Sequence, residues 1–293
     1  MSRCFYHILA IVTVAIWGAT FVSTKVLLQY GLSPVDIMVY RFALAYLCLW
    51  AISYRRVWAC NLRDELLMMG AALTGGSLYF LSENIALTYT YASNVSLVVC
   101  TAPLLTAVVM RLFYRSSRLS SHFIVGSFVA LAGVAMVVFN GHFVLNLSPV
   151  GDLLSLAAAL LWAFYSLIIK RLNGRYSNAF ITRKIFFYSL LSLAPLYACG
   201  THTLHVATLT EPPVWGNLLF LGVVASMLCF MAWNVSLEHL GTVRASNYIY
   251  LNPVVTLAVS AVILTEPLTP ISLLGALLTL VGVYLADRHH PAV

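Results

Sequence analysis

Long apolar stretches alternate with short polar segments along the whole of this 293-residue chain. A helix needs about 20 consecutive, mostly apolar residues to cross the hydrocarbon core of a bilayer. Ten stretches between charged and turn residues have this character, and each predicts a transmembrane helix. They cover residues 6–27, 35–54, 66–88, 92–113, 122–140, 149–170, 180–200, 214–237, 244–264 and 268–286.

A pattern of distinctive residues repeats once along the chain. Trp17 precedes Lys25 by eight residues, and Trp162 precedes Lys170 by the same interval. Further residues recur after 149 or 150 positions, and the matched pairs are Asn84 and Asn234, Pro103 and Pro253, Gly126 and Gly275, and Gly133 and Gly282. A repeated unit of nearly half the chain is typical of membrane transporters with internal repeats.

Each repeated unit contains five predicted helices. Because five is an odd number, the second unit enters the membrane from the side opposite to the first. We therefore predict an all-α polytopic membrane protein with ten transmembrane helices in two inverted five-helix repeats. The first repeat covers residues 1–141, and the second, inverted repeat covers residues 142–293. Alternating-access transporters use this arrangement.

Composition and charge agree with a membrane location. Hydrophobic residues make up 61% of the chain, charged residues 9%, and the mean hydropathy is +0.93; soluble domains carry about 25% charged residues. The formal net charge is +7, and with the N-terminus inside, fourteen of the sixteen Lys and Arg residues fall at cytoplasmic ends of the predicted spans. The positive-inside rule then predicts cytoplasmic termini and a plasma (cell inner) membrane location. It explains the basic balance without a nucleic-acid partner.

Two tryptophans lie where tryptophan is unusual. Trp17 and Trp162 fall near the centres of their predicted spans, whereas this residue prefers the membrane interfaces. An indole N–H in mid-membrane needs an acceptor. A polar cavity would supply one, and so would a carbonyl of a neighbouring helix in ordinary packing.

Glu83 is the one carboxylate well inside a predicted span. A lone charge at such a depth costs about 2.5 to 3.5 kcal/mol on the insertion scale. An ion pair with Arg41 or Lys25 would offset that cost. The alternative is that Glu83 faces the transport pathway and receives a substrate ammonium group or a coupled proton.

Neutral polar and aromatic residues gather on several predicted spans. Any one amide in mid-membrane usually makes a hydrogen bond between helices. Together, however, such groups on four helices indicate a hydrated cavity with aromatic walls for a small organic solute. The residues that suggest it include Asn84, Ser96, Asn234 and Asn247, with Tyr79, Tyr165, Tyr248 and Tyr250 as candidate walls.

Two prolines interrupt matched spans. Pro103 and Pro253 lie inside the fourth and ninth predicted spans, where each removes one backbone hydrogen bond. Interrupted helices at matched positions of two halves point to a transport site and its hinges. We expect both prolines to act as hinges, and a kink without a functional role is the alternative.

The order of several motifs resembles the drug/metabolite transporter superfamily, specifically its ten-helix EamA type. The resemblance is carried by AIWGATFVSTK, LSPVDIMVYRFALA, NIALTYTYASNVSLVVCTAPLLTAVV and SLLGALLTLVGVYLA. It implies a basket of helices around a central cavity, and export of amino acids, their derivatives or toxic small molecules. Glu83 departs from the family pattern, so its role rests on its depth alone. By position, the resemblance places on the cavity wall Trp17, Tyr79, Asn84, Ser96, Trp162, Tyr165, Trp233, Asn247 and Tyr250.

These observations favour a secondary transporter that exports a small organic metabolite, such as an amino acid, by alternating access. A membrane receptor or regulatory protein using the same cavity without net transport is the alternative. Proton coupling through Glu83 and uniport both fit. The chain shows no nucleotide-binding loop, paired catalytic carboxylates or Ser/His/Asp arrangement, so we expect neither an enzyme nor a cofactor or metal. The expected partners are the lipid bilayer and a small-molecule substrate.

Overall fold

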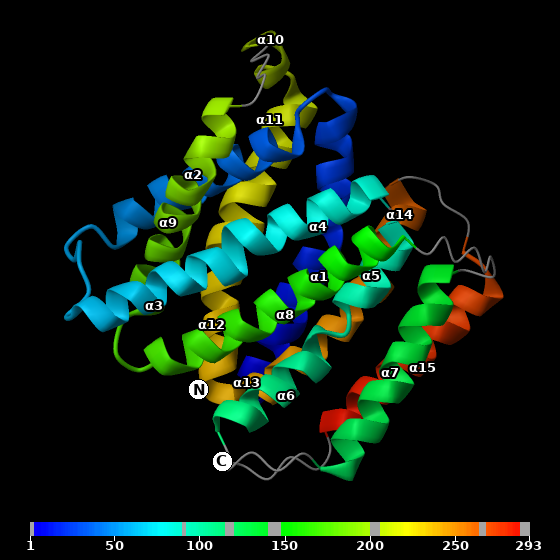
Figure 1. Ribbon diagram of the computed structural model, residues 1–293. Helices are drawn as coiled ribbons and strands as arrows, with labels where there is room; N and C mark the ends of the chain where they lie inside the picture. Colours follow the sequence, from blue (N-terminus) through cyan, green and yellow to red (C-terminus); the bar gives the residue numbers. More distant parts are fainter. Residues whose placement is uncertain are drawn as a thin grey trace.

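The computed structural model describes residues 3–89, 92–114, 120–139, 148–199, 206–263 and 268–287. Every regular element in these ranges is helical (Figure 1), which confirms the predicted all-α class. The first half contains α1 (Arg3–Gln29), α2 (Pro34–Ile52), α3 (Leu62–Ala72), the π-helical segment η1 (Leu73–Ser77), α4 (Leu78–Tyr89), α5 (Ala92–Val99), α6 (Ala102–Phe113) and α7 (Ser121–Phe139).

The second half contains the matching helices and one additional short helix. Its elements are α8 (Pro149–Leu172), α9 (Asn178–Cys199), the short α10 (Val206–Leu209), α11 (Pro212–Leu219), the π-helical η2 (Phe220–Leu228), α12 (Cys229–Leu240), α13 (Thr242–Ser246), the 3₁₀ segment η3 (Asn247–Leu251), α14 (Asn252–Ile263) and α15 (Pro270–Asp287). The predicted boundary at 141/142 lies outside the described residues.

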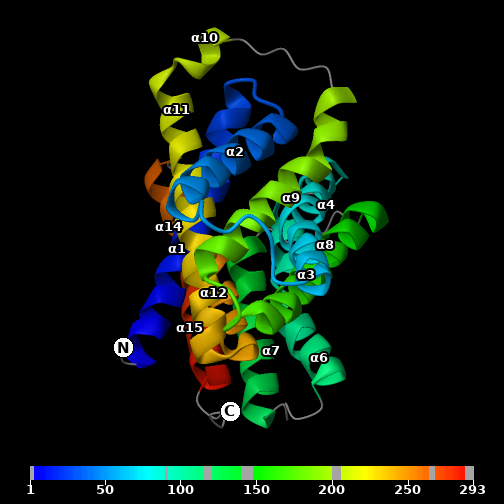
Figure 2. The ribbon, with the colours of Figure 1, turned by 90° about the vertical axis from the view of Figure 1, so that its left-hand side faces the viewer.

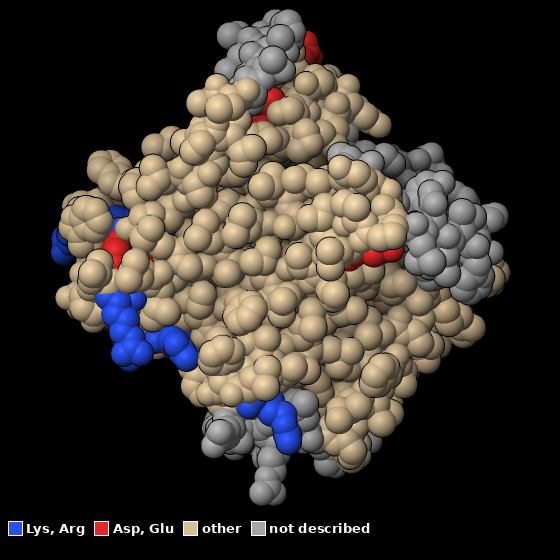
Figure 3. All heavy atoms as spheres, in the orientation of Figure 1, with Lys and Arg blue, Asp and Glu red and all other residues tan. Residues whose placement is uncertain are grey.

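Six continuous helical runs in the described ranges are long and apolar enough to cross a membrane. The other predicted spans are present as shorter or interrupted helices, such as Leu97–Phe113 and Pro270–Ala286. On the face drawn in Figure 3, Lys and Arg lie along the left and lower margins, and uncharged residues form the wide area between them. The fold is that of a polytopic membrane protein.

The two halves share their irregularities as well as their helices. η1 and η2 place a π-helical segment in the third helix of each half. The fourth helix of each half is interrupted just before its proline, because α6 begins at Ala102 before Pro103, and α14 begins at Asn252 before Pro253. The turns after the first helix of each half both contain a left-handed glycine, Gly31 with φ 87° and Gly174 with φ 78°.

The last helices of the two halves show that the halves are inverted. α7 and α15 lie side by side (Figures 1 and 2). Gly126 faces Gly282, and Gly133 faces Gly275, so closely that an added Cβ on any of them would overlap the facing backbone. The partner number falls as the residue number rises, so the helices are antiparallel. The first glycine of each helix meets the second glycine of the other, so an approximate two-fold axis relates α7 to α15.

The first helix of each half packs in the other half. α1 lies against α11, η2, α12 and α14, whereas α8 lies against α3, α4, α5 and α6. In Figure 2, α1 and α8 belong to two separate groups of helices. This exchange forms two bundles of mixed origin, and the centre of the molecule lies between them.

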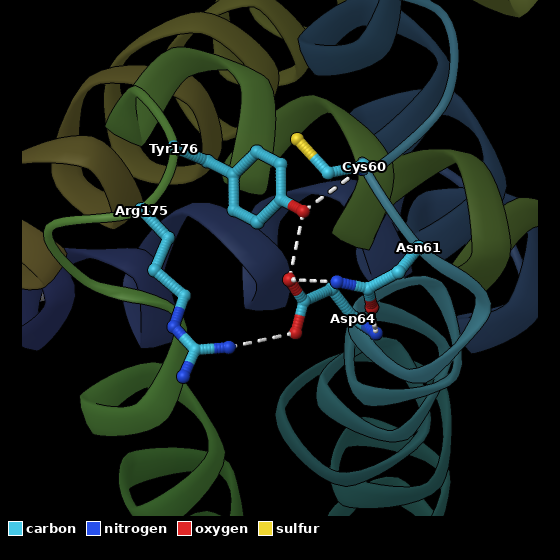
Figure 4. Close-up of polar contacts among 5 residues, drawn as sticks. All are labelled: Cys60, Asn61, Asp64, Arg175 and Tyr176. Carbon is cyan, nitrogen blue, oxygen red and sulfur yellow. Dashed lines mark hydrogen bonds and ion pairs between the residues drawn. The ribbon is translucent and has the colours of Figure 1, made fainter.

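A polar cluster outside the predicted spans joins α3 to the turn between α8 and α9 (Figure 4). Asp64 accepts hydrogen bonds from Arg175 at 3.1 Å and from the Tyr176 hydroxyl at 2.8 Å. The Tyr176 hydroxyl in turn accepts from the backbone N–H of Cys60 at 2.9 Å. Asn61 caps α3, its Oδ1 accepting from the N–H of Asp64 at 2.8 Å. The cluster ties the first half to the second at one end of the molecule.

A buried ion pair continues this connection. Lys184 on α9 pairs with Glu65 at the start of α3, and the Tyr188 hydroxyl also donates to that carboxylate. The N–H of Ala59 donates to the second carboxylate oxygen at 2.7 Å. Burial raises the pKa of Glu65, but these donors outweigh burial and hold the pKa below its ordinary value. Glu65 is therefore a charged, fully bonded anchor.

Candidate functional site

An aromatic cluster occupies the centre, between the two mixed bundles. The Trp17 ring of α1 meets the Trp162 ring of α8 edge to face, with centroids 5.5 Å apart. These two residues are repeat mates, so the cluster lies on the approximate two-fold axis. Trp233 of α12 packs on Trp17 at 5.2 Å, and Tyr79 of α4 packs on Trp162 at 5.3 Å. Ring centroids at 4.5–7 Å are the favourable range for aromatic pairs.

Two further rings complete this central aromatic cluster. Tyr165 lies 5.0 Å from Trp162 on the same helix, and Phe230 lies 5.7 Å from Trp17. Tyr165 and Trp233 are fully buried, whereas Trp17 and Tyr79 keep part of their surface accessible. Five of the residues predicted to line a hydrated chamber are thus brought together as rings packed on one another, namely Trp17, Tyr79, Trp162, Tyr165 and Trp233.

The indole N–H groups of the cluster differ in their partners. Trp17 Nε1 donates to the backbone oxygen of Ala225 in η2 at 3.0 Å. A carbonyl of a neighbouring helix was one of the two acceptors that the sequence left open for this indole. Trp162 Nε1 and Trp233 Nε1 are buried and have no hydrogen-bond partner among the described residues. A buried donor without a partner costs about 1–3 kcal/mol.

Two asparagines of the predicted site are held by the protein itself. Asn234 Oδ1 accepts from the Tyr165 hydroxyl at 2.8 Å, and Asn234 Nδ2 donates to Thr182 Oγ1 at 3.3 Å. Its repeat mate Asn84 donates to the sulfur of Met38 at 3.4 Å. Asn234 therefore links helices by hydrogen bonds. This is the structural role that an amide in mid-membrane usually has.

The interrupted ninth helix supplies further polar groups. Asn247 in η3 is buried, and both atoms of its amide have no hydrogen-bond partner among the described residues. The Tyr250 hydroxyl interacts with Ser127, although neither hydroxyl makes a hydrogen bond of normal geometry. The η3 segment of the ninth helix packs against α6 of the fourth, so the two interrupted helices are in contact. The side chain of Ser96 lies outside the described residues.

Glu83 and Arg41 are both buried beside the aromatic cluster, with 8% and 6% of their surface exposed. They interact electrostatically but do not form a direct ion pair, which was one of the alternatives that the sequence left open. Arg41 Nε donates to Ser226 Oγ at 3.0 Å, and its guanidinium lies 4.8 Å from the Phe80 ring centroid. The other predicted partner of Glu83, the Lys25 side chain, lies outside the described residues.

The local contacts of Glu83 are sparse. The Tyr79 hydroxyl lies 3.5 Å from Oε1, long for an O–H···O bond, which is usually 2.5–3.0 Å. The described part of the chain contains no group of three His, Cys, Asp or Glu residues that could hold a metal. Glu83 and Arg41 are therefore two buried, oppositely charged side chains beside the central aromatic cluster.

Sequence reasoning missed Phe230 and Ser226 as members of the site. Phe230 was detectable, because it is the repeat mate of Phe80, which stacks with Arg41. Ser226 carried no signal, since its role depends on how α2 packs against η2. The prolines 103 and 253 begin new helical segments as expected, and their action as hinges stays a prediction.

Several known proteins similar to this chain are named as transporters, efflux pumps or exporters. An archaeal protein from Archaeoglobus fulgidus, named an uncharacterized transporter, is 27% identical over 97% of this chain and 98% of its own length. A protein of Escherichia coli (strain K12), named a probable amino-acid metabolite efflux pump, is 25% identical over 95% of this chain and 93% of its own. A probable terminal-alkyne amino-acid exporter of Streptantibioticus cattleyicolor is 27% identical over 95% and 92%.

A solved crystal structure shares the fold, with a TM-score of 0.78 at 18% identity and 97% coverage of both chains. The model of the EamA-like transporter family matches twice, over residues 5–139 and 149–286. These two matches coincide with the two halves whose glycines meet across the approximate two-fold axis. The chain therefore belongs to the EamA-like transporter family.

Proposed function

We propose that this protein is a secondary transporter that exports small organic metabolites, such as amino acids or related compounds, by alternating access. Two relatives similar over almost the whole chain are named for amino-acid export. The buried charges and packed rings at the centre suit a solute with a polar head and an apolar body. No contact among the described residues favours the receptor alternative.

One observation supports alternating access above the others: the repeat mates Trp17 and Trp162 touch at the approximate two-fold axis. Each comes from a first helix that packs in the opposite half. When one mixed bundle rocks against the other, this contact is the point about which both move. Opening to either side of the membrane then exposes the same central groups.

We also propose an inner-membrane location with both termini cytoplasmic. The start of α1 and the end of α15 lie at the same end of the molecule (Figures 1 and 2), and the distribution of basic residues supports the cytoplasm as the side they face. Proton coupling through Glu83 is a part of the proposal that a pH gradient across the membrane would test.

Counterflow in proteoliposomes tests the function. Purified protein is reconstituted with a panel of unlabelled amino acids, amines and metabolites inside, and labelled solute is added outside. We expect exchange of one class of solute, reduced by Trp17→Ala and by Trp162→Ala with membrane insertion intact. Binding without counterflow would favour a receptor, and normal flux in both variants would assign the rings to packing alone.

A further inference from the structure

The two halves differ at one position of the central aromatic cluster. With the offset of 150 residues that relates Asn84 to Asn234, Glu83 is the repeat mate of Trp233, and Tyr79 is the repeat mate of Cys229. The second half therefore presents a thiol and an indole where the first half presents a phenol and a carboxylate. Polarity at the centre is one-sided, and it lies on the side of α4.

Among the described residues, Arg41 is the cation that interacts with this carboxylate. Arg41 interacts electrostatically with Glu83 and with Cys229, the repeat mate of Tyr79. The hydrogen bond to Ser226 is the one that the Arg41 side chain makes among the described residues. A guanidinium has five N–H donors, so most of them stay free. Each buried ion costs several kcal/mol unless its hydrogen bonds are satisfied.

We propose that Glu83 and Arg41 together recognise the zwitterionic head of an α-amino acid, an inference that rests on the transport function proposed above. Glu83, with the Tyr79 hydroxyl, receives the ammonium group, and Arg41 receives the carboxylate. The amino-acid side chain lies against the central aromatic cluster. The unpartnered N–H of Trp162 is a further donor to the ligand.

The physical reason is complementarity between two separated charges. Glu83 and Arg41 attract each other but do not close into a direct ion pair, so a ligand with both charges satisfies both residues when it is inserted between them. A simple amine leaves Arg41 uncompensated, and a simple carboxylic acid leaves Glu83 uncompensated. Sites built around buried polar groups reject ligands that lack the matching group by large factors.

Matched analogues on the unmodified protein test this inference. Each amino acid in the counterflow panel is accompanied by its decarboxylated amine and its deaminated acid, so that only the head group changes. We expect the transported amino acid to exchange at least about tenfold faster than either analogue. An amine or acid that exchanges as fast as its parent overturns the inference while the transport function stands. Exchange of no compound at all overturns the transport function.

Two variants test the assignment of each charge. Glu83→Gln is expected to lower amino-acid exchange about tenfold or more and to change exchange of the deaminated acid less than about twofold. Arg41→Gln is likewise expected to lower amino-acid exchange about tenfold or more and to change exchange of the decarboxylated amine less than about twofold. Equal losses for parent and analogues would contradict the assignment. The matched controls are the substitutions Glu211→Gln and Arg63→Gln at exposed residues. Size-exclusion profiles identify any variant that does not fold. If a charge variant does not fold, the comparison of analogues on the unmodified protein tests the inference instead.

Discussion

The indole of Trp17 is tied to the backbone oxygen of Ala225 by a hydrogen bond of 3.0 Å. Trp162, the repeat mate of Trp17, has no such partner. The equivalent acceptor in the first half would be Gly75 in η1, which instead lies under the ring of Tyr165. The two halves thus share their fold but hold their central indoles differently.

This difference predicts unequal effects of two matched substitutions. Trp17→Phe removes a hydrogen bond and should destabilise the protein by about 0.5–1.5 kcal/mol. Trp162→Phe loses the same ring volume but removes a buried N–H without a partner, so it should destabilise the protein less than Trp17→Phe does. The apparent melting temperature of the detergent-purified protein measures both. Equal losses in the two variants would contradict the hydrogen-bond assignment.

The glycine contact between α7 and α15 predicts a strong steric effect. Gly126→Ala places a methyl group into the backbone of Ala286 and Gly282, and overpacking of this kind costs about 1–3 kcal/mol. Gly216→Ala is the control, because no atom lies within 4 Å of its added Cβ. We expect a lower melting temperature for Gly126→Ala and no loss for Gly216→Ala. Comparable melting temperatures would show that these helices separate more readily than the contact indicates.

We predict that removal of the Tyr165 hydroxyl lowers the stability of the protein. Tyr165→Phe leaves the buried Asn234 Oδ1 without its donor, and an unsatisfied buried acceptor costs about 1–3 kcal/mol. Tyr250→Phe is the matched control, since its hydroxyl makes no hydrogen bond of normal geometry. Thermal unfolding should show the larger loss for Tyr165→Phe. A larger loss for Tyr250→Phe than for Tyr165→Phe would contradict a stabilising role of the hydrogen bond between Tyr165 and Asn234.

We predict that the Glu65 carboxylate makes the folding stability of the protein depend on pH in the acidic range. Burial raises its pKa, but the bonds from Lys184, Tyr188 and Ala59 outweigh burial, so the pKa in the folded protein is below the ordinary 4.5. The folded state therefore binds this proton less tightly than the unfolded state. The stabilisation is complete above the ordinary value and is lost as the pH falls through the folded value.

Melting temperatures between about pH 6 and pH 3 measure this effect. Glu65→Gln should lower stability at neutral pH and flatten the fall in acid, whereas the exposed control Glu211→Gln should leave both unchanged. A Glu65→Gln profile parallel to that of the unmodified protein would assign the acid sensitivity to other groups.

Hydrophobic spacing and repeated residues were sufficient to predict the inverted fold, because a bilayer restricts spanning segments to helices and an odd helix number dictates inversion. The same repeat matched Trp17 with Trp162, and the structure shows that the two rings touch. Contacts between helices could not be predicted in this way. That Arg41 binds Ser226 instead of Glu83 depends on how α2 packs against η2, and the sequence does not show which residues of two packed helices meet.

The opposite orientation of the two halves is the basis of the proposed transport cycle, and labelling from one side of the membrane tests it most directly. Tyr30 and Arg171 are exposed residues at the ends of the matched helices α1 and α8. Single cysteines are introduced there after replacement of the six native cysteines. A membrane-impermeant maleimide added to intact cells should label Tyr30→Cys at once and Arg171→Cys only after permeabilisation. Labelling of both from the same side would contradict the inverted arrangement.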